Sequence, residues 1–378
     1  MTSRSGDDTR SKLQISRNTS LASMTSLELG GAADRFVTIG SVDEVREAVC
    51  FARSELLPIC VLGFGSNVVI ADEGVLGLMI HPAISGFELE RERRGRRVQL
   101  TASAGESWDD LVAMTVDQSL AGVECLSGIP GSVGAAPIQN IGAYGQEVAS
   151  VIDRVRVLDL ANLEVSWIRH ERCGFGYRTS IFRRDPGRYL VLAVSFSLVS
   201  GGRAAIRYDE LKRTLGVGRT LPPVEDVREA VLELRRSKSM LIEEGDPNRR
   251  SVGSFFLNPV VDPRSLRSLE VYARETATSG QTDHVPAFPV ADGKFKVPAA
   301  WLIERAGFKK GMRRGSVGIS TAHSLALVHH GGGTTAELIE LAREIRDGVR
   351  RETGIELEPE PTFFGFPTAN PLADTVES

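Results

Sequence analysis

Two glycine-rich stretches hold the residues best suited to binding a phosphate. The longer one runs from Cys125 to Gly145 and has glycine at positions 128, 131, 134, 142 and 145. The shorter one, residues 61–67, reads Val-Leu-Gly-Phe-Gly-Ser-Asn and directly follows an apolar run. Glycine at this density allows tight turns, and the backbone N–H groups left free by such turns form an anion-binding concavity. Two such loops in one chain predict a long phosphate-bearing ligand that is held at two places.

The shorter loop does not complete the fingerprint of a Rossmann dinucleotide-binding fold. Gly63 and Gly65 have the right spacing for the first two glycines, but the third position is Val68. The Rossmann fingerprint needs all three glycines between a strand and a helix. The sequence therefore favours a different nucleotide-binding fold.

Composition and charge exclude several classes of partner. The chain has 378 residues, of which 42% are hydrophobic and 25% charged, which is typical of a globular protein with two or three domains. The net charge of −4 gives no electrostatic footprint for nucleic acid. No apolar run approaches the ~18 residues of a membrane span. We therefore expect no nucleic acid and no membrane partner.

The cysteines and the N-terminus bear on the compartment. The four cysteines are scattered, with no C-x-x-C motif and no histidine pair at zinc spacing, so no metal site is expected. Reduced thiols fit a cytoplasmic protein best. Residues 1–20 are polar and lack the apolar core of a signal peptide, so they are predicted to form a disordered tail.

Apolar periodicity and capping residues predict a mixed α and β organisation over the first 200 residues. Helices are expected at 42–54 and 108–119, with Ser41 and Ser107 as N-caps. Strands are expected at 35–39, 57–61, 77–81, 97–102, 154–160, 164–169 and 189–198.

The second half predicts another α+β unit with its own apolar faces. An amphipathic helix is expected at 224–238, with Val227, Val231 and Leu234 on one face. Further elements are helices at 299–306 and 335–353, strand-like runs at 251–261 and 324–328, and an extended segment at 355–364.

Seven short segments, taken in order, resemble the UDP-N-acetylenolpyruvoylglucosamine reductase (MurB) family. They cover about residues 20–365 and are 62–67, 128–134, 139–145, 177–180, 253–259, 298–304 and 357–360. The resemblance implies an α+β fold with an FAD-binding half of the vanillyl-alcohol-oxidase (PCMH) type, plus a separate α+β substrate-binding domain. The implied ranges are 21–200 for the FAD-binding domain (lobes about 21–82 and 83–200), 201–223 for a mobile loop and linker, and 224–365 for the substrate-binding domain.

The resemblance also implies an activity. Members of the family reduce UDP-N-acetylglucosamine enolpyruvate to UDP-N-acetylmuramate in peptidoglycan precursor synthesis. They use non-covalent FAD and take NADPH as co-substrate, and a monomer is expected. Besides the flavin, this chemistry needs a proton donor and a group that stabilises negative charge on the enolpyruvyl carboxylate.

The resemblance assigns these roles to three residues. Ser254 is the expected proton donor, and Arg178 and Glu360 are the expected stabilising pair. A fixed guanidinium can engage a carboxylate through two parallel hydrogen bonds, which suits the enolpyruvyl group. Glu358 is the competing choice for Glu360, because residues two apart on a strand share a face.

The resemblance also implies binding residues. Cofactor contacts are expected from Gly63, Gly65, Ser66, Asn67, Gly128, Gly131, Ser132, Gly134, Asn140, Gly142, Ala143 and Tyr144. Substrate contacts are expected from Tyr177, Tyr208, Lys238, Asn258, Phe288 and His323. Among these, Tyr208 is expected to close over the UDP group and Lys238 to meet a phosphate. The sequence leaves open whether Lys309 or Lys310 also reaches the phosphate.

Two other functions would use the same glycine loops. An FAD-dependent sugar or alcohol oxidase would need no equivalent of Ser254, Arg178 and Glu360, would consume oxygen and would ignore NADPH. A flavin- or nucleotide-binding regulatory module would bind its ligand without turnover.

Overall fold

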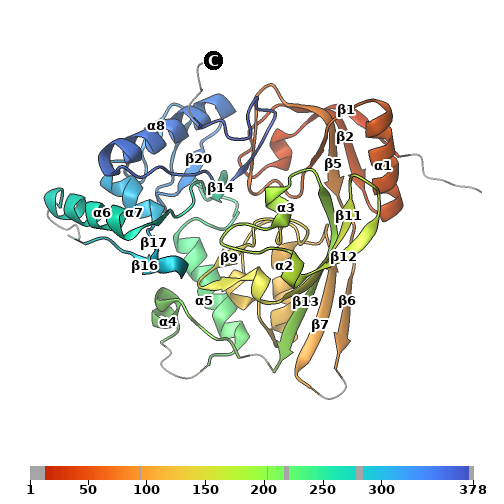
Figure 1. The fold of residues 1–378 in the computed structure, drawn as a ribbon, viewed down its shortest axis with the longest axis horizontal. Coiled ribbons are helices and arrows are strands. Elements are labelled where there is room, and N and C mark those ends of the chain that lie inside the picture. Colours follow the sequence, from red (N-terminus) through yellow and green to blue (C-terminus); the bar gives the residue numbers. More distant parts are fainter. Residues whose placement is uncertain (1–12, 93–94, 202, 217–220, 278–283, 374–378) are drawn as a thin grey trace, which may run out of the picture.

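A computed structural model of the chain describes residues 13–92, 95–201, 203–216, 221–277 and 284–373. It has two large sheets in the N-terminal half and smaller sheets flanked by helices in the C-terminal half (Figure 1). Every helix within these ranges is too short or too polar to cross a membrane.

The first sheet of the N-terminal half is mainly parallel. Its strand order is β1 (Ser16–Ser20), β2 (Ala32–Ile39), β5 (Val75–Pro82) and β3 (Ile59–Val61). β2, β5 and β3 run parallel, and β1 adds an antiparallel edge. Helix α1 (Val42–Ser54) connects β2 to β3 and buries the stripe Val45, Ala48, Val49 and Ala52 against the sheet. The Ser41 side chain accepts from Glu44 N, which confirms the predicted N-cap.

β1 corrects the predicted disordered tail. Residues 16–20 pair with β2 in register, with Ser16 opposite Phe36 and Ser20 opposite Ala32. The strand is polar and mostly exposed, so it lacks the apolar signal by which a strand is recognised. Its order comes from backbone hydrogen bonds to β2, the next strand along the chain. Residues 1–12 of the predicted tail lie outside the described residues.

The second sheet is antiparallel. Its strand order is β12 (Val165–Arg169), β11 (Ile152–Asp159), β13 (Tyr189–Ser200), β7 (Arg97–Ser103) and β6 (Phe87–Arg91), with the short β8 (Leu120–Ala121) also on β13. Its core includes side chains of α2 (Trp108–Asp117), whose N-cap Ser107 accepts from Asp110 N.

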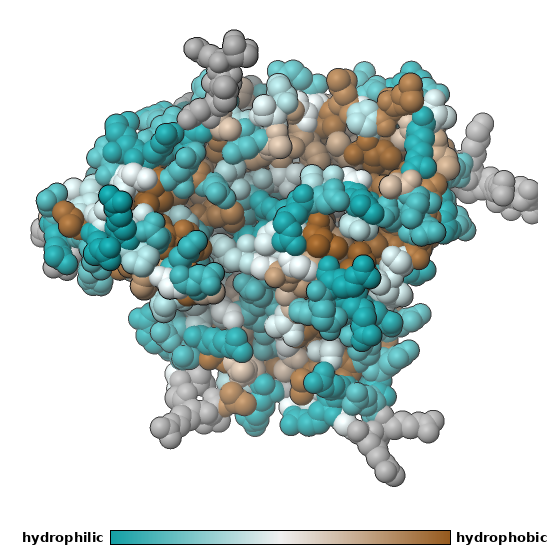
Figure 2. Space-filling model, viewed as in Figure 1, coloured by the Kyte–Doolittle hydropathy of each residue, from teal (hydrophilic) through white to brown (hydrophobic). Residues whose placement is uncertain are grey.

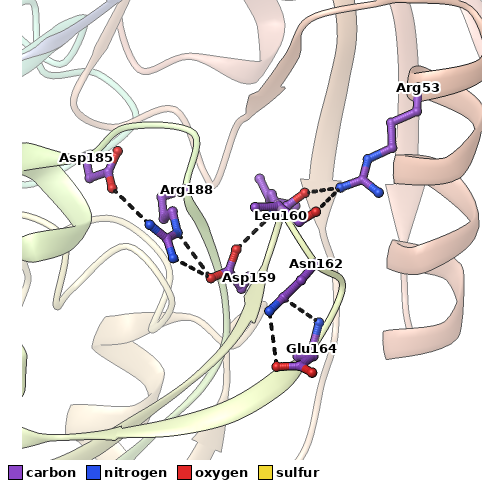
Figure 3. Close-up of polar contacts among 8 residues, drawn as sticks. Arg53, Asp159, Leu160, Asn162, Glu164, Asp185 and Arg188 are labelled. Carbon is purple, nitrogen blue, oxygen red and sulfur yellow. Dashed lines mark hydrogen bonds and ion pairs between the residues drawn. The ribbon is translucent and has the colours of Figure 1, made fainter.

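The two sheets meet where α1 reaches the β11–β12 turn (Figure 3). Arg53, in the last turn of α1, donates through Nη2 to the carbonyl oxygens of Leu160 (2.5 Å) and Ala161 (2.7 Å). Asp159, at the base of the same turn, accepts from Arg188 at 3.0 Å. Apolar residues of α1 and of β11 and β13 share one buried cluster. The two sheets therefore form one body.

Helix α5 (Val224–Ser237) corrects the predicted domain boundary at residue 224. Its buried residues Val224, Val227, Ala230 and Val231 belong to the core of the second sheet, together with α2. An amphipathic pattern shows that a helix has an apolar face but not which core receives that face. The helix therefore packs with the N-terminal half of the chain.

The predicted linker also contains a helix. Residues Asp209–Leu215 form α4, with acidic residues in its first turn, basic residues in its last turn and Gly216 as a left-handed C-cap. Tyr208 is the N-cap residue of this helix. Residues 202 and 217–220 of the linker lie outside the described residues.

The C-terminal half is built around an antiparallel sheet and three helices. The sheet order is β14 (Ser251–Ser254), β20 (Ala326–His329), β19 (Val317–Ile319) and β18 (Arg313–Arg314), and a smaller sheet has the order β15 (Val260–Val261), β17 (Phe295–Lys296) and β16 (Phe288–Pro289). The helices are α6 (Pro263–Glu275), α7 (Ala299–Arg305) and α8 (Thr335–Thr353).

Two sequence expectations for this half were incomplete. The strand expected at 251–261 is split into β14 and β15, with a register shift at Gly253, whose φ is +72°. Helix α6 was not predicted, although Asp262 caps it and Pro263 occupies its first turn, which is a standard helix start. The helices predicted near 299–306 and 335–353 are confirmed.

Short elements complete the chain. They are α3 (Ile181–Arg184), the pair β9 (Gly142–Ala143) and β10 (Gln146–Glu147), and 3-10 turns at Ala22–Met24, Glu124–Leu126, Val148–Ser150, His170–Arg172 and Ala291–Gly293. The large apolar side chains gather in four buried clusters. On the face in Figure 2, hydrophilic residues prevail and apolar ones form separate patches.

The end of the chain returns to the N-terminal half. Strand β21 (Thr362–Phe364) pairs in parallel with β4 (Val68–Ile70), which directly follows the first glycine loop. Asp72 caps α8 from the other half, accepting from Thr335 N (2.8 Å) and Ala336 N (2.9 Å). These contacts fix how the two halves lie against each other.

Candidate active site

The two glycine loops lie against each other. Ser66 Oγ, in the first loop, donates to Pro130 O in the second at 2.9 Å. A Cβ atom added to Gly131 would lie 3.1 Å from Ser66 Oγ, and one added to Gly63 would lie 3.0 Å from Ser132 Oγ. The loops therefore form one cradle, and side chains at positions 63 and 131 would intrude into it.

The cradle fits a long cofactor with phosphates. A cavity of about 310 Å³ beside the first loop is lined by residues 23–26, Gly63, Phe64, His81 and Ile242. Backbone N–H groups in glycine turns supply the donors that phosphate oxygens need. The residues present thus fit the phosphates of an FAD, and contact of both loops with it stays a prediction.

Two of the glycines are also required by contacts within the protein. A Cβ on Gly65, whose φ is +65°, would lie 2.0 Å from Met24 O. A Cβ on Gly134 would lie 2.6 Å from the Cβ of Ala104. Glycine at these two positions lets the loops pack closely against the rest of the protein. Contact of Gly65 and Gly134 with a cofactor stays a prediction. Gly128, also expected to contact the cofactor, packs against Leu241 in the same way.

Asn140 organises the second loop through its side chain. Its Nδ2 donates to Glu147 and to Gly176 O, both at 3.0 Å, and its Oδ1 accepts from Ala149 N at 3.0 Å. The residue is buried, with 1% of its surface exposed. The amide of Asn140 is therefore occupied by the protein itself.

Arg178 and Glu360 meet in the buried space between the two halves. Arg178 Nε lies 3.1 Å from Glu360 Oε1, and the two side chains are 19% and 13% exposed. Arg178 also donates from Nη2 to Gly142 O (2.6 Å) and from Nη1 to Asn140 O (3.4 Å). The Nε atom that faces Glu360 is buried, and its N–H is poorly aligned for a hydrogen bond. The guanidinium is therefore fixed by the second loop and paired with the Glu360 carboxylate.

Burial raises the pKa of the Glu360 carboxyl, and the guanidinium groups of Arg178 and Arg183 oppose this rise. Glu358, the competing choice for the catalytic carboxylate, is exposed. The structure thus pairs Arg178 with Glu360 and not with Glu358.

The backbone of Arg178 is strained. Its φ is +51°, in the left-handed region that costs about 1–2 kcal/mol for a residue with a Cβ atom. Thr179 N donates to Gly176 O at 3.2 Å and closes a tight turn with Tyr177 and Arg178 at its centre. The third of the four residues in such a turn, here Arg178, is commonly glycine when its φ is positive. An arginine at this position is typical of a functional site.

Ser254 is brought to the same place by β14. It is the last residue of the strand and pairs with Ala326, after the register shift at Gly253. The next residue, Phe255, accepts from Glu360 N through its carbonyl oxygen at 2.9 Å. The three residues assigned to catalysis therefore converge from three separate segments of the chain.

Tyr144 and Tyr208 form an aromatic pair at the edge of the cradle. Their ring centroids are 5.6 Å apart and nearly perpendicular. Burial is the main cause that raises the pKa of Tyr144 to about 12. The Lys238 ammonium lies 6.0 Å from the Tyr144 ring and forms an ion pair with Glu210 of α4 at 2.7 Å. The structure thus places Tyr208 and Lys238 together, with Glu210 as an additional partner.

His323 lies beside two lysines. Burial, helped by Lys238 and Lys310, lowers the pKa of His323 to about 4. Its Nδ1 accepts from Leu325 N at 3.1 Å, as a neutral imidazole can. Of the two candidate lysines, Lys310 is the one that acts on His323.

The remaining substrate candidates lie around Tyr177. Lys296 Nζ is 4.8 Å from the Tyr177 ring, and burial raises the pKa of the Tyr177 phenol. Asn258 caps α7 by accepting from Ala299 N at 2.9 Å. Phe288 is 53% exposed and pairs with Lys296 across the β16–β17 ladder. Phe288 is therefore at the rim of this group of residues.

Several residues of the site were not predicted from the sequence. Gln139, Arg183, Glu210 and Lys296 all contact predicted site residues or their neighbours. Gln139 and Arg183 lie within or close to the quoted segments, and Glu210 lies two residues after Tyr208, but a match to a segment does not show which side chains turn inward. Lys296 lies just before one of the segments and had no signal of its own.

Comparisons with known proteins agree with this geometry. Residues 33–168 match the FAD binding domain model, and residues 246–364 match the model of the C-terminal domain of UDP-N-acetylenolpyruvoylglucosamine reductase. A UDP-N-acetylenolpyruvoylglucosamine reductase from Thermobifida fusca is 47% identical over 93% of this chain and 98% of its own length. The chain belongs to the UDP-N-acetylenolpyruvoylglucosamine reductase family. The predicted family and the predicted FAD-binding half are confirmed.

Further relatives cover nearly the whole chain as well. A protein of the same name from Saccharopolyspora erythraea is 45% identical over 94% of this chain and 98% of its own length. The crystal structure of the family member from Thermus caldophilus superposes with a TM-score of 0.60 at 25% identity, covering 93% of this chain and 99% of that one. The match to the C-terminal model begins at residue 246, after α5, as the packing of that helix requires.

The strain at Arg178 leads to a comparison of two variants. Arg178→Gly and Arg178→Ala both remove the guanidinium, but only glycine adopts a positive φ without cost. We expect Arg178→Gly to be more stable than Arg178→Ala by about 1 kcal/mol. Chemical denaturation of both variants measures this difference. Equal stabilities would show that the turn relaxes when the side chain is removed.

The lowered pKa of His323 predicts a pH-dependent stability. The folded protein favours the neutral imidazole, so stability is full above the unfolded value of 6.5 and falls as the pH drops towards 4. The expected loss at pH 4 is on the order of 3 kcal/mol. His323→Gln should remove this contribution while keeping a side-chain acceptor for Leu325 N. Denaturation between pH 7.5 and 4 tests this, and an unchanged acid limb in the variant would contradict it.

Proposed function

We propose that this chain reduces UDP-N-acetylglucosamine enolpyruvate to UDP-N-acetylmuramate through bound FAD, with NADPH as co-substrate, in peptidoglycan precursor synthesis. Family membership makes it an FAD-dependent oxidoreductase. The observation that carries the proposal is the buried pair of Arg178 and Glu360, which the hydrogen bond from Glu360 N to Phe255 O brings next to Ser254. A fixed guanidinium beside an acid–base carboxyl group suits the reduction of an enolpyruvyl carboxylate.

The reaction adds a hydride equivalent to the terminal carbon of the double bond and a proton to the neighbouring carbon. Bound FAD supplies the electron pair that NADPH provides. The protein must stabilise the negative charge that develops on the enolpyruvyl carboxylate and must deliver the proton. In our proposal, Arg178 stabilises the charge, because its guanidinium is already held by Gly142 O and Asn140 O and needs no reorganisation.

Ser254 delivers the proton in this proposal. A serine hydroxyl is a weak acid, so it needs a neighbouring group that relays a proton or lowers the cost of the alkoxide. Glu360 is suited to this relay, since burial raises its pKa towards the working range of an acid–base group. Its backbone is bonded to Phe255, next to Ser254, which keeps the two residues together.

The outer residues bind the nucleotide part of the substrate. Lys238 and Lys310 form a basic rim suited to a diphosphate, the neutral His323 lies beside them, and Tyr208 at the N-terminus of α4 closes over the diphosphate. The remaining contacts proposed are those of Tyr177, Asn258 and Phe288. The proposal also includes a monomeric protein in the cytoplasm, where the four cysteines remain free thiols as they are in the structure.

Bound FAD gives the first test. We expect the purified protein to be yellow and to release FAD on heating, because backbone N–H groups in the two glycine loops would hold its phosphates by hydrogen bonds alone. Absorption spectra before and after heat treatment, followed by addition of NADPH under anaerobic conditions, measure this. A colourless protein that cannot be reconstituted with FAD would contradict the proposed function.

Ser254→Ala separates the two half-reactions. Reduction of the flavin by NADPH needs no proton donor at the enolpyruvyl carbon and should stay close to the wild-type rate. Reoxidation by the enolpyruvyl substrate should slow by roughly 10²-fold or more, as expected for a lost general acid. Anaerobic stopped-flow absorbance follows each step. Reoxidation at the wild-type rate would show that Ser254 is not the proton donor.

A further inference from the structure

Glu360 lies on a short segment that is bonded on both sides. Its own N–H donates to Phe255 O at 2.9 Å, and two residues later Thr362 N donates to Asn67 O at 3.1 Å. The first contact leads to Ser254 and the second to the first glycine loop. The position of this segment therefore decides where the Glu360 carboxylate lies.

Arg183 holds the same segment from a third direction. It belongs to α3, and its Nη2 donates to the Glu360 backbone oxygen at 2.9 Å. Its Nη1 donates at 3.4 Å to Gln139 Oε1, the oxygen that also accepts from Asn67 Nδ2 at 2.6 Å. One planar guanidinium thus joins Glu360 to the second glycine loop and, through Gln139, to the first. A lysine could not make both bonds in this geometry.

Arg183 also acts on Glu360 by its charge. Burial raises the pKa of Glu360, and the nearby cations Arg178 and Arg183 oppose that rise. Two other titratable groups lie in the same surroundings: Tyr177, whose pKa is raised by burial, and the exposed Glu358, which acts on Arg183. Arg178 is the only cation in an ion pair with the carboxylate among the described residues, so Arg183 acts from the backbone side.

We propose that Arg183 is a positioning residue for Glu360. It fixes the carboxylate beside Arg178 and ties its placement to the two loops of the cofactor cradle. This inference rests on the proposed function for its effect on turnover, but the contact between Arg183 and Glu360 can be tested without turnover.

The first test measures the coupling by stability. At a pH below 4.5 Glu360 is protonated in both folded and unfolded states, and removal of Arg183 then costs only its bonds. As the pH rises through the raised pKa of Glu360 in the folded state, the carboxyl group ionises. In the variant without Arg183 it does so beside one cation, Arg178, whereas the wild-type protein provides two. Arg183→Gln should therefore lose roughly 2–4 °C more in Tm at pH 8 than at pH 4.5. In a Glu360→Gln background, this pH-dependent part should vanish.

Arg184 offers a matched control on the same helix. It is exposed and donates to Gly174 O (3.0 Å) and Thr179 Oγ1 (3.3 Å), away from Glu360. Arg184→Gln removes the same charge and should show no Tm difference between the two pH values. Arg183→Lys keeps the positive charge and loses the two guanidinium hydrogen bonds to Glu360 O and Gln139 Oε1. It should therefore lose the same Tm at pH 8 as at pH 4.5, without recovering the full wild-type stability.

The second test measures turnover. In Arg183→Gln, reoxidation of the flavin by the enolpyruvyl substrate should slow by about 10–100-fold, since a displaced catalytic group can cost ~10²-fold. Its pH inflection should move upward, and FAD affinity should stay within about threefold. Arg183→Lys should keep the inflection and recover part of the rate.

The outcomes separate the two proposals. No pH-dependent coupling in the Tm measurements overturns the role of Arg183, whatever the rates. Coupling in Tm together with a wild-type protein that does not react with the enolpyruvyl substrate supports the role of Arg183 and overturns the proposed function. Loss of FAD and stability in Arg183→Gln without any shift of the pH dependence would reduce Arg183 to a packing residue and contradict the inference.

Discussion

The parallel pairing of β21 with β4 is the contact on which the site depends. It brings the last part of the chain next to the first glycine loop and places Glu360 within reach of Arg178, which lies on the other half. Without this pairing the segment that carries Glu360 would lose its connection to the first glycine loop. The proposed catalytic residues come from both halves and depend on the register of three residues on each strand.

An ion pair in this position is costly, and its surroundings show how the cost is offset. A buried carboxylate loses its hydration, and a single cation seldom compensates for the loss. Glu360 has two guanidinium groups nearby, and Arg178 in turn donates to two backbone oxygens. The left-handed backbone of Arg178 adds strain to the same place. The site therefore combines several locally unfavourable features that only the completed fold supports, as is common where function constrains structure.

The sequence predicted local structure well and distant partners poorly. Capping residues and apolar periodicity were sufficient for α1, α2 and α8, because these signals lie within the element itself. β1 is polar and is ordered by hydrogen bonds to β2, so its own residues did not predict a strand. Helix α5 packs on a core formed from residues far upstream, so its own residues did not show to which domain it belongs. The catalytic trio came from family segments. Arg183 and Gln139 bond through backbone and amide oxygens, which no residue pattern specifies.

The ion pair between Lys238 and Glu210 has a consequence for ligand selection. In this structure the ammonium already has an anionic partner on α4, at 2.7 Å. A phosphate that binds Lys238 must displace Glu210, whose carboxylate then returns to the solvent. The binding free energy that the phosphate gains is therefore only the difference between its own contact with Lys238 and the ion pair that it replaces. An isolated phosphate ion gains little from such an exchange, because the competing carboxylate is tethered and has a high effective concentration. A ligand that is anchored at both of its ends can displace it, so the exchange favours extended nucleotide sugars over the small anions that surround them.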